Sequence, residues 1–349
     1  MLNAKDLIFL SVLIATLFGC DVEKSDIKPN ATKIIFDTDM GSDCDDVGAL
    51  ALLNVYADRG EAEILGCIYS SGKVPFGAGI IDAINTYYGR QDIPVGANYN
   101  NEVGDPKDKM LAQKLAHDTS AFHNNIVHNF DAEEQTRLNR KLLSEQEDSS
   151  VTYITVGHTK GLYDLLVSKP DDISSLAGLE LVKQKVKRWV AMGALNANNE
   201  EGNYTKSWNF FFNETAPYSE YAVQNFPGEI VFIATGSDIM TGKSLKETPA
   251  GNIVRTAYRD WLWNTMQKTL DDQRPSWDII AVYYAVEGLG NFLEKEEPGW
   301  LEFDAEKGCH WNRGDNKYQH RYIISREENS TDFEDYLNKM IATQPIQNY

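Results

Sequence analysis

The chain has 349 residues, of which 42% are hydrophobic and 11% aromatic, and its formal net charge is −19. This composition can supply the core of one large or two smaller α/β domains, and it excludes global disorder. The acidic balance excludes binding of nucleic acid through a basic face, so we expect no nucleic-acid partner.

The N-terminus has the pattern of an export signal followed by a tether. Lys5 precedes the apolar stretch LIFLSVLIATLFG, which is short for a membrane span and typical of a signal-peptide core. The tetrad LFGC resembles a bacterial lipobox, so we predict a signal peptide over 1–20 that ends in a lipidated Cys20. An ordinary secretory signal or an N-terminal anchor helix is the alternative. Residues 21–32 are polar and predict a tether. The expected location is the cell envelope, facing the periplasm or the surface, with membrane contact only through the lipid.

Strands and helices alternate after the tether. The hydrophobic periodicity predicts strands at 33–38, 62–71 and 92–97 and helices at 45–59 and 76–89. Strand–helix–strand order of this kind is typical of a parallel sheet that is covered by helices on both faces.

The alternation resumes after a polar stretch, 98–149, for which we expect helices and loops over the sheet edge. The elements predicted beyond it are strands at 151–157, 186–194 and 229–235 and helices at 162–169, 216–226, 252–270 and 277–288. Residues 299–325 predict antiparallel strands. No repeat or further linker is evident. We therefore predict a single α/β domain over 33–349, with a mostly parallel central sheet, helices on both faces and a small antiparallel C-terminal addition.

Three cysteines follow Cys20, at positions 44, 67 and 309. An odd number outside the cytoplasm excludes a fully paired framework, and no Cys/His spacing typical of zinc is present. Cys44 and Cys67 both lie near the ends of neighbouring predicted strands. A disulfide between them and a pair of free thiols are the two alternatives.

Five aspartates fall within ten positions at the end of the first predicted strand: Asp37, Asp39, Asp43, Asp45 and Asp46. Two carboxylates ~4 Å apart repel by about 4 kcal/mol at an effective dielectric constant near ~20, so positive charge must offset them. Ligands bind outside the carboxyl ends of strands in open α/β sheets, and oxygen-only donors favour Ca²⁺ or Mg²⁺. A solvated turn with Asp45 as a helix cap is the alternative, but capping uses one or two carboxylates. The sequence therefore predicts a cation site.

Two known families place aspartates at this point. In haloacid-dehalogenase phosphatases a Thr or Val follows DxDx, whereas Met40 and Gly41 follow DTD here. The stretch IIFDTDMGSDCDDVGALALL (34–53) instead resembles the DTDPGxDDAxAL pattern of the inosine-uridine preferring nucleoside hydrolase family, with two residues added before the paired aspartates. Further segments resemble that family in the same order: GRQDIPVGA (89–97), VGHTKGLYDLL (156–166), VAMGA (190–194), GNYTKSWNFFFNETA (202–216) and RPSWDIIAVYYA (274–285).

The resemblance implies a calcium-dependent nucleoside N-ribohydrolase, which hydrolyses the N-glycosidic bond of ribonucleosides to free base and ribose through an oxocarbenium-like sugar. By position, the implied Ca²⁺ ligands are the side chains of Asp39, Asp46 and Asp278 and the main-chain carbonyl of Lys160. Asp39 would also be the general base that removes a proton from a metal-polarised water. Asp45, Asn203 and Asn209 would bind sugar hydroxyls.

The chain departs from the family pattern at several positions. The two-residue insertion leaves Asp43 without a counterpart, so it either replaces Asp45, contacts the metal or lies in a bulge. Ser207 stands in place of a Glu, which removes one sugar contact. Trp277 replaces a histidine that is tied to leaving-group activation in part of the family; it either stacks on the base or packs in the core. The same alternatives hold for Trp208. No leaving-group acid is assigned, and a structural role is the favoured interpretation for His123, His128 and His158.

The leading hypothesis is a lipid-anchored enzyme that salvages extracellular nucleosides, with a preference for purines. A hydrolase of another N- or O-glycoside on the same fold is one alternative, and a non-catalytic sugar- or nucleoside-binding lipoprotein is another. Asp39 argues against the non-catalytic alternative, because a binding protein needs no general base. The partner is a small-molecule nucleoside, and a homo-oligomer is compatible with the sequence.

Overall fold

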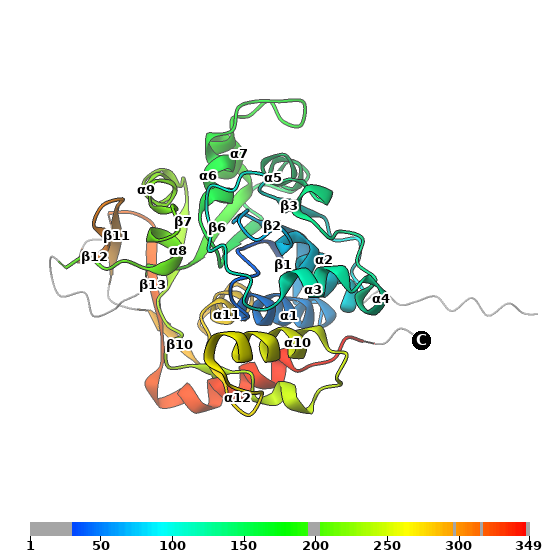
Figure 1. The fold of residues 1–349 in the computed structure, drawn as a ribbon. Helices are drawn as coiled ribbons and strands as arrows, with labels where there is room; N and C mark the ends of the chain where they lie inside the picture. The colour runs from blue at the N-terminus through cyan, green and yellow to red at the C-terminus, as the bar shows by residue number, and fades with distance from the viewer. Residues whose placement is uncertain (1–29, 195–202, 296–297, 315–316, 347–349) are drawn as a thin grey trace, which may run out of the picture.

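A nine-stranded sheet forms the centre of the computed structural model, which describes residues 30–194, 203–295, 298–314 and 317–346 (Figure 1). The strand order is β10–β13–β7–β6–β5–β1–β2–β3–β4, and every neighbouring pair is parallel except β10 with β13. The strands are β1 (Thr32–Thr38), β2 (Ala62–Tyr69), β3 (Val95–Ala97), β4 (Glu133–Glu134), β5 (Val151–Thr155), β6 (Val186–Met192), β7 (Glu229–Ile233), β10 (Leu293–Lys295) and β13 (His320–Ser325). The predicted fold class is confirmed.

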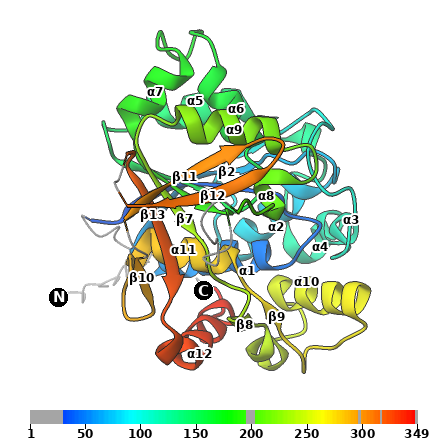
Figure 2. The same cartoon turned by 90° about the vertical axis from the view of Figure 1, so that its left-hand side faces the viewer.

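Helices cover both faces of the sheet (Figures 1 and 2). One face carries α1 (Asp45–Asp58), α2 (Gly77–Tyr87), α10 (Ile253–Trp261), α11 (Asp278–Glu287) and α12 (Ser330–Ile341). The other carries α5 (Gln135–Ser144), α6 (Lys160–Val167), α7 (Gly178–Lys185) and α9 (Ala216–Asn225). Shorter elements are α3 (Ala112–His117), α4 (Thr119–Phe122), α8 (Trp208–Phe211), the pair β8 (Met240–Thr241) and β9 (Arg274–Pro275), and the hairpin of β11 (Gly299–Asp304) and β12 (Gly308–Arg313).

The central strand β1 divides the hydrophobic core into two. Ile34 and Phe36 join the cluster under α1, whereas Ile35 points to the cluster under α5, α6 and α7. All three are fully buried, as expected for a parallel strand with both faces covered. Burial of one such side chain stabilises the fold by roughly 1.5–3 kcal/mol.

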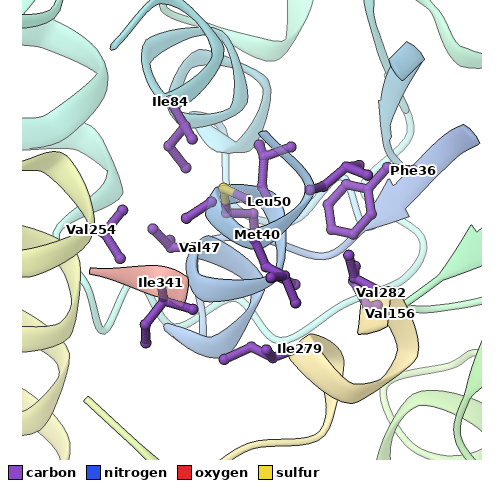
Figure 3. Packing of buried hydrophobic residues seen from close by; sticks show 14 of the residues in the cluster. Phe36, Met40, Val47, Leu50, Ile84, Val156, Val254, Ile279, Val282 and Ile341 are labelled. Carbon is purple, nitrogen blue, oxygen red and sulfur yellow. The ribbon is translucent and has the colours of Figure 1, made fainter. Parts of the chain in front are cut away.

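Helix α1 lies between the sheet and the outer helices and is buried from Asp45 through Tyr56. Figure 3 shows Met40, Val47 and Leu50 surrounded by side chains from the sheet and from α2, α10, α11 and α12. Gly48 lets α1 approach α11 closely, because a Cβ there would lie 2.8 Å from the Cδ1 atom of Ile279. This close packing brings the N-termini of α1 and α11 together at one end of the sheet.

The C-terminal region differs from the sequence-based prediction. Residues 299–325 do not form one antiparallel unit: β11 and β12 pair antiparallel, but β13 enters the main sheet parallel to β7. The reason is its apolar content, since Tyr322 and Ile323 are buried on opposite faces of the sheet. The predicted helix 252–270 is also shorter, because α10 passes into a π-helical turn at Leu262–Met266. The sequence analysis did not predict α7 or α12.

Cys44 and Cys67 are buried free thiols, so the disulfide alternative is not realised. The predicted signal peptide, Cys20 and most of the tether lie outside the described residues. Within the described ranges, no helix has the length and apolar character needed to cross a membrane.

Candidate active site

A pocket of about 290 Å³ opens at the carboxyl end of the central strands, near the lower end of the usual size of small-molecule sites. The sheet order reverses there, since β2 to β4 extend from one side of β1 and β5 to β7 from the other. The loops after β1 and β5 therefore diverge and leave a crevice, which is where open α/β sheets bind ligands. The lining residues are Asp39, Ser42, Asp43, Asp45, Asp46, Val156, Met192, Gly193, Ser207, Trp208, Asn209, Trp277 and Asp278.

Three buried carboxylates converge on the floor of this pocket, and we call Asp45, Asp46 and Asp278 the acidic trio. One oxygen from each lies within 4.8 Å of the others. Burial raises the pKa of Asp45 to about 6 and raises the pKa of Asp46 and Asp278 well above the usual range, with further increases from neighbouring carboxylates. Two helix N-termini face the trio, because α1 begins at Asp45 and α11 at Asp278, and their dipoles favour negative charge.

The trio fits a hard divalent cation. All of its donors are oxygens, as Ca²⁺ and Mg²⁺ prefer. The Oδ1 atom of Asp278 is buried without a hydrogen-bond partner among the described residues, so one ligand atom is uncommitted. Asp46 is oriented by the hydroxyl of Thr38, which donates to its Oδ1 atom.

Arg274, which the sequence analysis did not single out, supplies positive charge to this cluster. Its Nη1 atom lies 2.8 Å from Oδ1 of Asp45 and also pairs with Asp43. The guanidinium is 2% exposed, and its centre lies 4.7 Å from the ring of Trp261 and 5.4 Å from that of Trp277. Burial lowers the pKa of Arg274 to about 9, so it stays protonated at neutral pH.

Asp43 and Asp45 therefore have partners within the protein. Asp43 belongs to the pair with Arg274 and not to the acidic trio. The Oδ2 atom of Asp45 accepts from the backbone N–H groups of Trp277 (3.1 Å) and Asp278 (3.4 Å), which caps α11. Both oxygens of Asp45 thus accept hydrogen bonds within the protein, and its contact with a sugar hydroxyl stays a prediction.

Asp39 lines the pocket but lies outside the convergent trio. Its Oδ2 atom is 3.0 Å from Nδ1 of His158, at the end of β5. The two strand ends approach closely because residue 157 is glycine; a Cβ there would lie 2.4 Å from the nitrogen of Asp39. Asp37 faces away from the pocket and accepts from the hydroxyl of Tyr153 at 3.1 Å.

Two predicted site residues do not reach the pocket. The ammonium of Lys160 pairs with Asp164, and neither residue lines the pocket. Asn203 is exposed, and its carbonyl accepts from Nδ1 of His310 at 2.9 Å. Val156, which directly follows β5, does line the pocket, and its carbonyl accepts from the side chain of Asn209. The notion that the main-chain carbonyl of Lys160 is a metal ligand stays a prediction, since the contacts of its side chain do not bear on it.

Aromatic rings form the pocket walls. Trp277 is half-buried at the start of α11, and Trp208 is 52% exposed on α8, with its ring 5.8 Å from that of Phe212. Ser207, which stands in place of the family's Glu, accepts from the backbone N–H of Ala194 at 3.1 Å. The site thus combines an acidic floor with apolar walls.

The fold is shared with nucleoside hydrolases. The chain matches no family model and no curated relative. Among solved structures it is similar to an inosine-uridine preferring nucleoside hydrolase from Bacillus anthracis (TM-score 0.62, 15% identity, 89% of this chain and 99% of that chain). It is also similar to a purine-preferring ribonucleoside hydrolase from Gardnerella vaginalis (0.60, 15%, 89% and 98%) and to the type III effector protein XopQ complexed with adenosine diphosphate ribose (0.62, 11%, 91% and 95%). These comparisons show that the chain has the nucleoside hydrolase fold.

Replacement of Arg274 tests its role as the internal counter-charge. In the presence of a chelator, we expect Arg274→Met to lower the free energy of unfolding by roughly 3–5 kcal/mol, because it leaves a buried carboxylate unpaired. Asp43→Ala removes only the partly exposed partner and should cost about 1 kcal/mol or less. Urea unfolding of both variants measures the difference. Equal losses would show that Arg274 does not act through the buried Asp45.

Proposed function

We propose that this protein hydrolyses the N-glycosidic bond of ribonucleosides, with Ca²⁺ as its cofactor. The observation that supports the proposal is the buried acidic trio beneath two tryptophans, at the switch point of a nucleoside hydrolase fold. The two parts of a nucleoside match these two features. The ribose becomes cationic during cleavage, which suits the acidic trio, and the flat base suits the tryptophans.

The acidic trio is the set of groups that would hold the cation. When bound, Ca²⁺ supplies electrostatic polarisation of a water and of the sugar hydroxyls. The two helix N-termini and Arg274 keep the trio's carboxylates together before binding, so the donors are already arranged.

Asp39 is the general base of the proposed reaction. It lies at the pocket edge beside the trio, where its carboxylate can accept a proton from the attacking water. The surrounding aspartates then favour the positive charge that develops on the ribosyl ring. Asn209, whose amide nitrogen is held by the carbonyl of Val156, is the polar group of the opposite wall and the proposed partner of a sugar hydroxyl.

A second candidate is cleavage of another ribosyl compound. One structural neighbour is complexed with adenosine diphosphate ribose, and Ser207, which lines the pocket, is a smaller side chain than a glutamate. A panel that includes both nucleosides and ribosylated nucleotides distinguishes the two candidates. Absence of turnover on the whole panel would favour a binding protein.

We also propose that the protein is anchored to the cell envelope through a lipid on Cys20, on the sequence evidence alone. Membrane fractionation of Cys20→Ser tests this: release from the membrane or blocked processing is expected, and unchanged fractionation would indicate an uncleaved helix.

Calcium should stabilise the fold, and more strongly at higher pH. The folded-state pKa of Asp45 is raised from 3.8 to about 6, so its share of the metal-free protein's stability is lost as pH rises through about 6. At ~100 times its Kd, Ca²⁺ adds about 2.7 kcal/mol, or roughly 5 °C in Tm. Thermal melts with Ca²⁺ or chelator should therefore diverge more at about pH 7.5 than at about pH 5. Coincident melts at both pH values would contradict the cation site.

Asp39→Asn should lower kcat/KM on a nucleoside by roughly 10²–10⁴-fold, because the general base is lost. A reducing-sugar assay on the purified protein measures released ribose. Asp37→Asn is the matched control: it lies two residues earlier on β1, outside the pocket, and should keep most of the activity. Equal losses in the two variants would argue against Asp39 as the base.

Trp277→Ala should reduce kcat/KM on inosine, adenosine and guanosine by about tenfold or more, since base–aromatic stacking contributes roughly 1–3 kcal/mol. Indole cannot donate a proton at neutral pH, so the unmodified enzyme should prefer these purines, which can be protonated at N7, over uridine. Trp277→Phe keeps a ring and should retain most of the activity. A preference for uridine, or full purine activity of Trp277→Ala, would return Trp277 to a packing role.

A further inference from the structure

We propose that His158 is a positioning residue for Asp39, and that Asn213 fixes the tautomer in which His158 does this. The inference rests on the proposed function, in which Asp39 is the general base. In the sequence His158 is one histidine among several, with a structural role as the favoured interpretation. The geometry around its ring points to a more specific task.

Both ring nitrogens of His158 have defined neighbours. Nδ1 lies 3.0 Å from Oδ2 of Asp39, and Nε2 lies 3.2 Å from Nδ2 of Asn213. An amide nitrogen only donates hydrogen bonds, so Nε2 is the acceptor and the proton of the neutral ring is on Nδ1. That N–H is then next to the carboxylate of Asp39.

The Nδ1 group is also uncommitted elsewhere. His158 is 0% exposed, and its Nδ1 atom has no well-aligned hydrogen-bond partner among the described residues. A buried unsatisfied donor costs about 1–3 kcal/mol, so a native structure retains one for a reason. The carboxylate of Asp39 is within reach, and the contact needs only a change of angle. Catalytic hydrogen bonds are often poorly aligned before substrate binds and tighten in the complex.

The backbone around His158 is rigid enough to hold a neighbour in place. Its carbonyl accepts from the hydroxyl of Ser70 at 3.0 Å, and the hydroxyl of Thr159 lies 2.8 Å from that of Ser219. Asn213 has a left-handed backbone (φ 58°), which asparagine tolerates, and its carbonyl accepts from Gly104 at 3.2 Å. The backbone at His158 and Thr159 is thus held by Ser70 and Ser219, and the ring of His158 is held by Asn213.

The orientation of a general base decides which of its lone pairs accepts the proton of the water. A small misplacement of the carboxylate therefore lowers the reaction rate strongly. A neutral donor on Oδ2 leaves Oδ1 as the free acceptor of Asp39 and does not add a formal charge to the acidic pocket. Loss of this contact should therefore reduce kcat more than it raises KM, because His158 is fully buried and does not line the pocket.

The tautomer is the first test. Nitrogen NMR of the ring in the purified protein should show a protonated Nδ1 and an unprotonated Nε2. The opposite tautomer would overturn the proposal, whether or not the protein hydrolyses nucleosides. Asn213→Leu should leave the two tautomers mixed; an unchanged Nδ1–H tautomer in that variant would remove Asn213 from the assignment.

Kinetics on the preferred nucleoside is the second test. His158→Leu should lower kcat by roughly 10–100-fold, as for partners that orient a functional group, with KM changed by less than about threefold. His158→Asn places an amide N–H at the position of Nδ1 and should recover most of the loss. His320→Asn is the control: this buried histidine begins β13, which lies three strands from β5 in the sheet, and it should leave kcat unchanged.

The outcomes separate the two proposals. If the unmodified protein cleaves no nucleoside, the proposed function fails while the NMR result still decides the tautomer. If it cleaves nucleosides and folded His158→Leu retains full kcat, the positioning role fails alone. Should His158→Leu not fold, His158→Asn and Asn213→Leu still test the proposal. The positioning role requires His158→Asn to retain most of kcat, so a fall in kcat equal to that of Asp39→Asn would contradict it.

Discussion

The structure depends on the burial of five carboxylates at one end of a parallel sheet, those of Asp37, Asp39, Asp45, Asp46 and Asp278. Charged groups of one sign cannot be packed together without partners, because desolvation and mutual repulsion both favour the neutral form. Here the carboxylates have different polar partners. Tyr153 is next to Asp37, His158 is next to Asp39, and Thr38 donates to Asp46, whereas Arg274 pairs with both Asp43 and Asp45. One guanidinium does not balance the three carboxylates of the acidic trio, and a divalent cation is the partner that their oxygens suit.

The hydrophobic core decides where this cluster lies. Helix α1 is buried almost throughout, and Gly48 allows it to pack tightly on α11, so both helices begin at the same end of the sheet. Their N-termini then add two partial positive charges to the site. The close passage of Gly157 past Asp39 brings the end of β5 to the end of β1. Close packing at residues that adjoin the acidic trio and Asp39 thus positions these carboxylates.

The charge of the pocket has consequences for its ligands. Five lining carboxylates face one guanidinium, so the ionised pocket attracts cations and disfavours anionic groups near the floor. Such an environment is suited to a sugar that gains positive charge during bond cleavage. The tryptophan walls restrict the other end of the ligand to something flat and apolar. The pocket is therefore acidic at one end and aromatic at the other, as a nucleoside has a polar sugar at one end and a flat base at the other.

The sequence by itself determined the alternation of strands and helices, the parallel sheet and the position of the aspartates at a strand end, because these follow from local periodicity. It also indicated Asp39, Asp46, Asn209, Trp277 and Asp278, all of which line one pocket. Only the tertiary structure decided that Arg274 reaches Asp45, 229 positions away, and that Asp43 belongs to that pair. It likewise decided that Asn203 lies outside the pocket and that β13 joins the main sheet. The physical reason is common to these cases: strand pairing and long-range charge pairing are set by how distant segments pack, which hydrophobic periodicity does not encode.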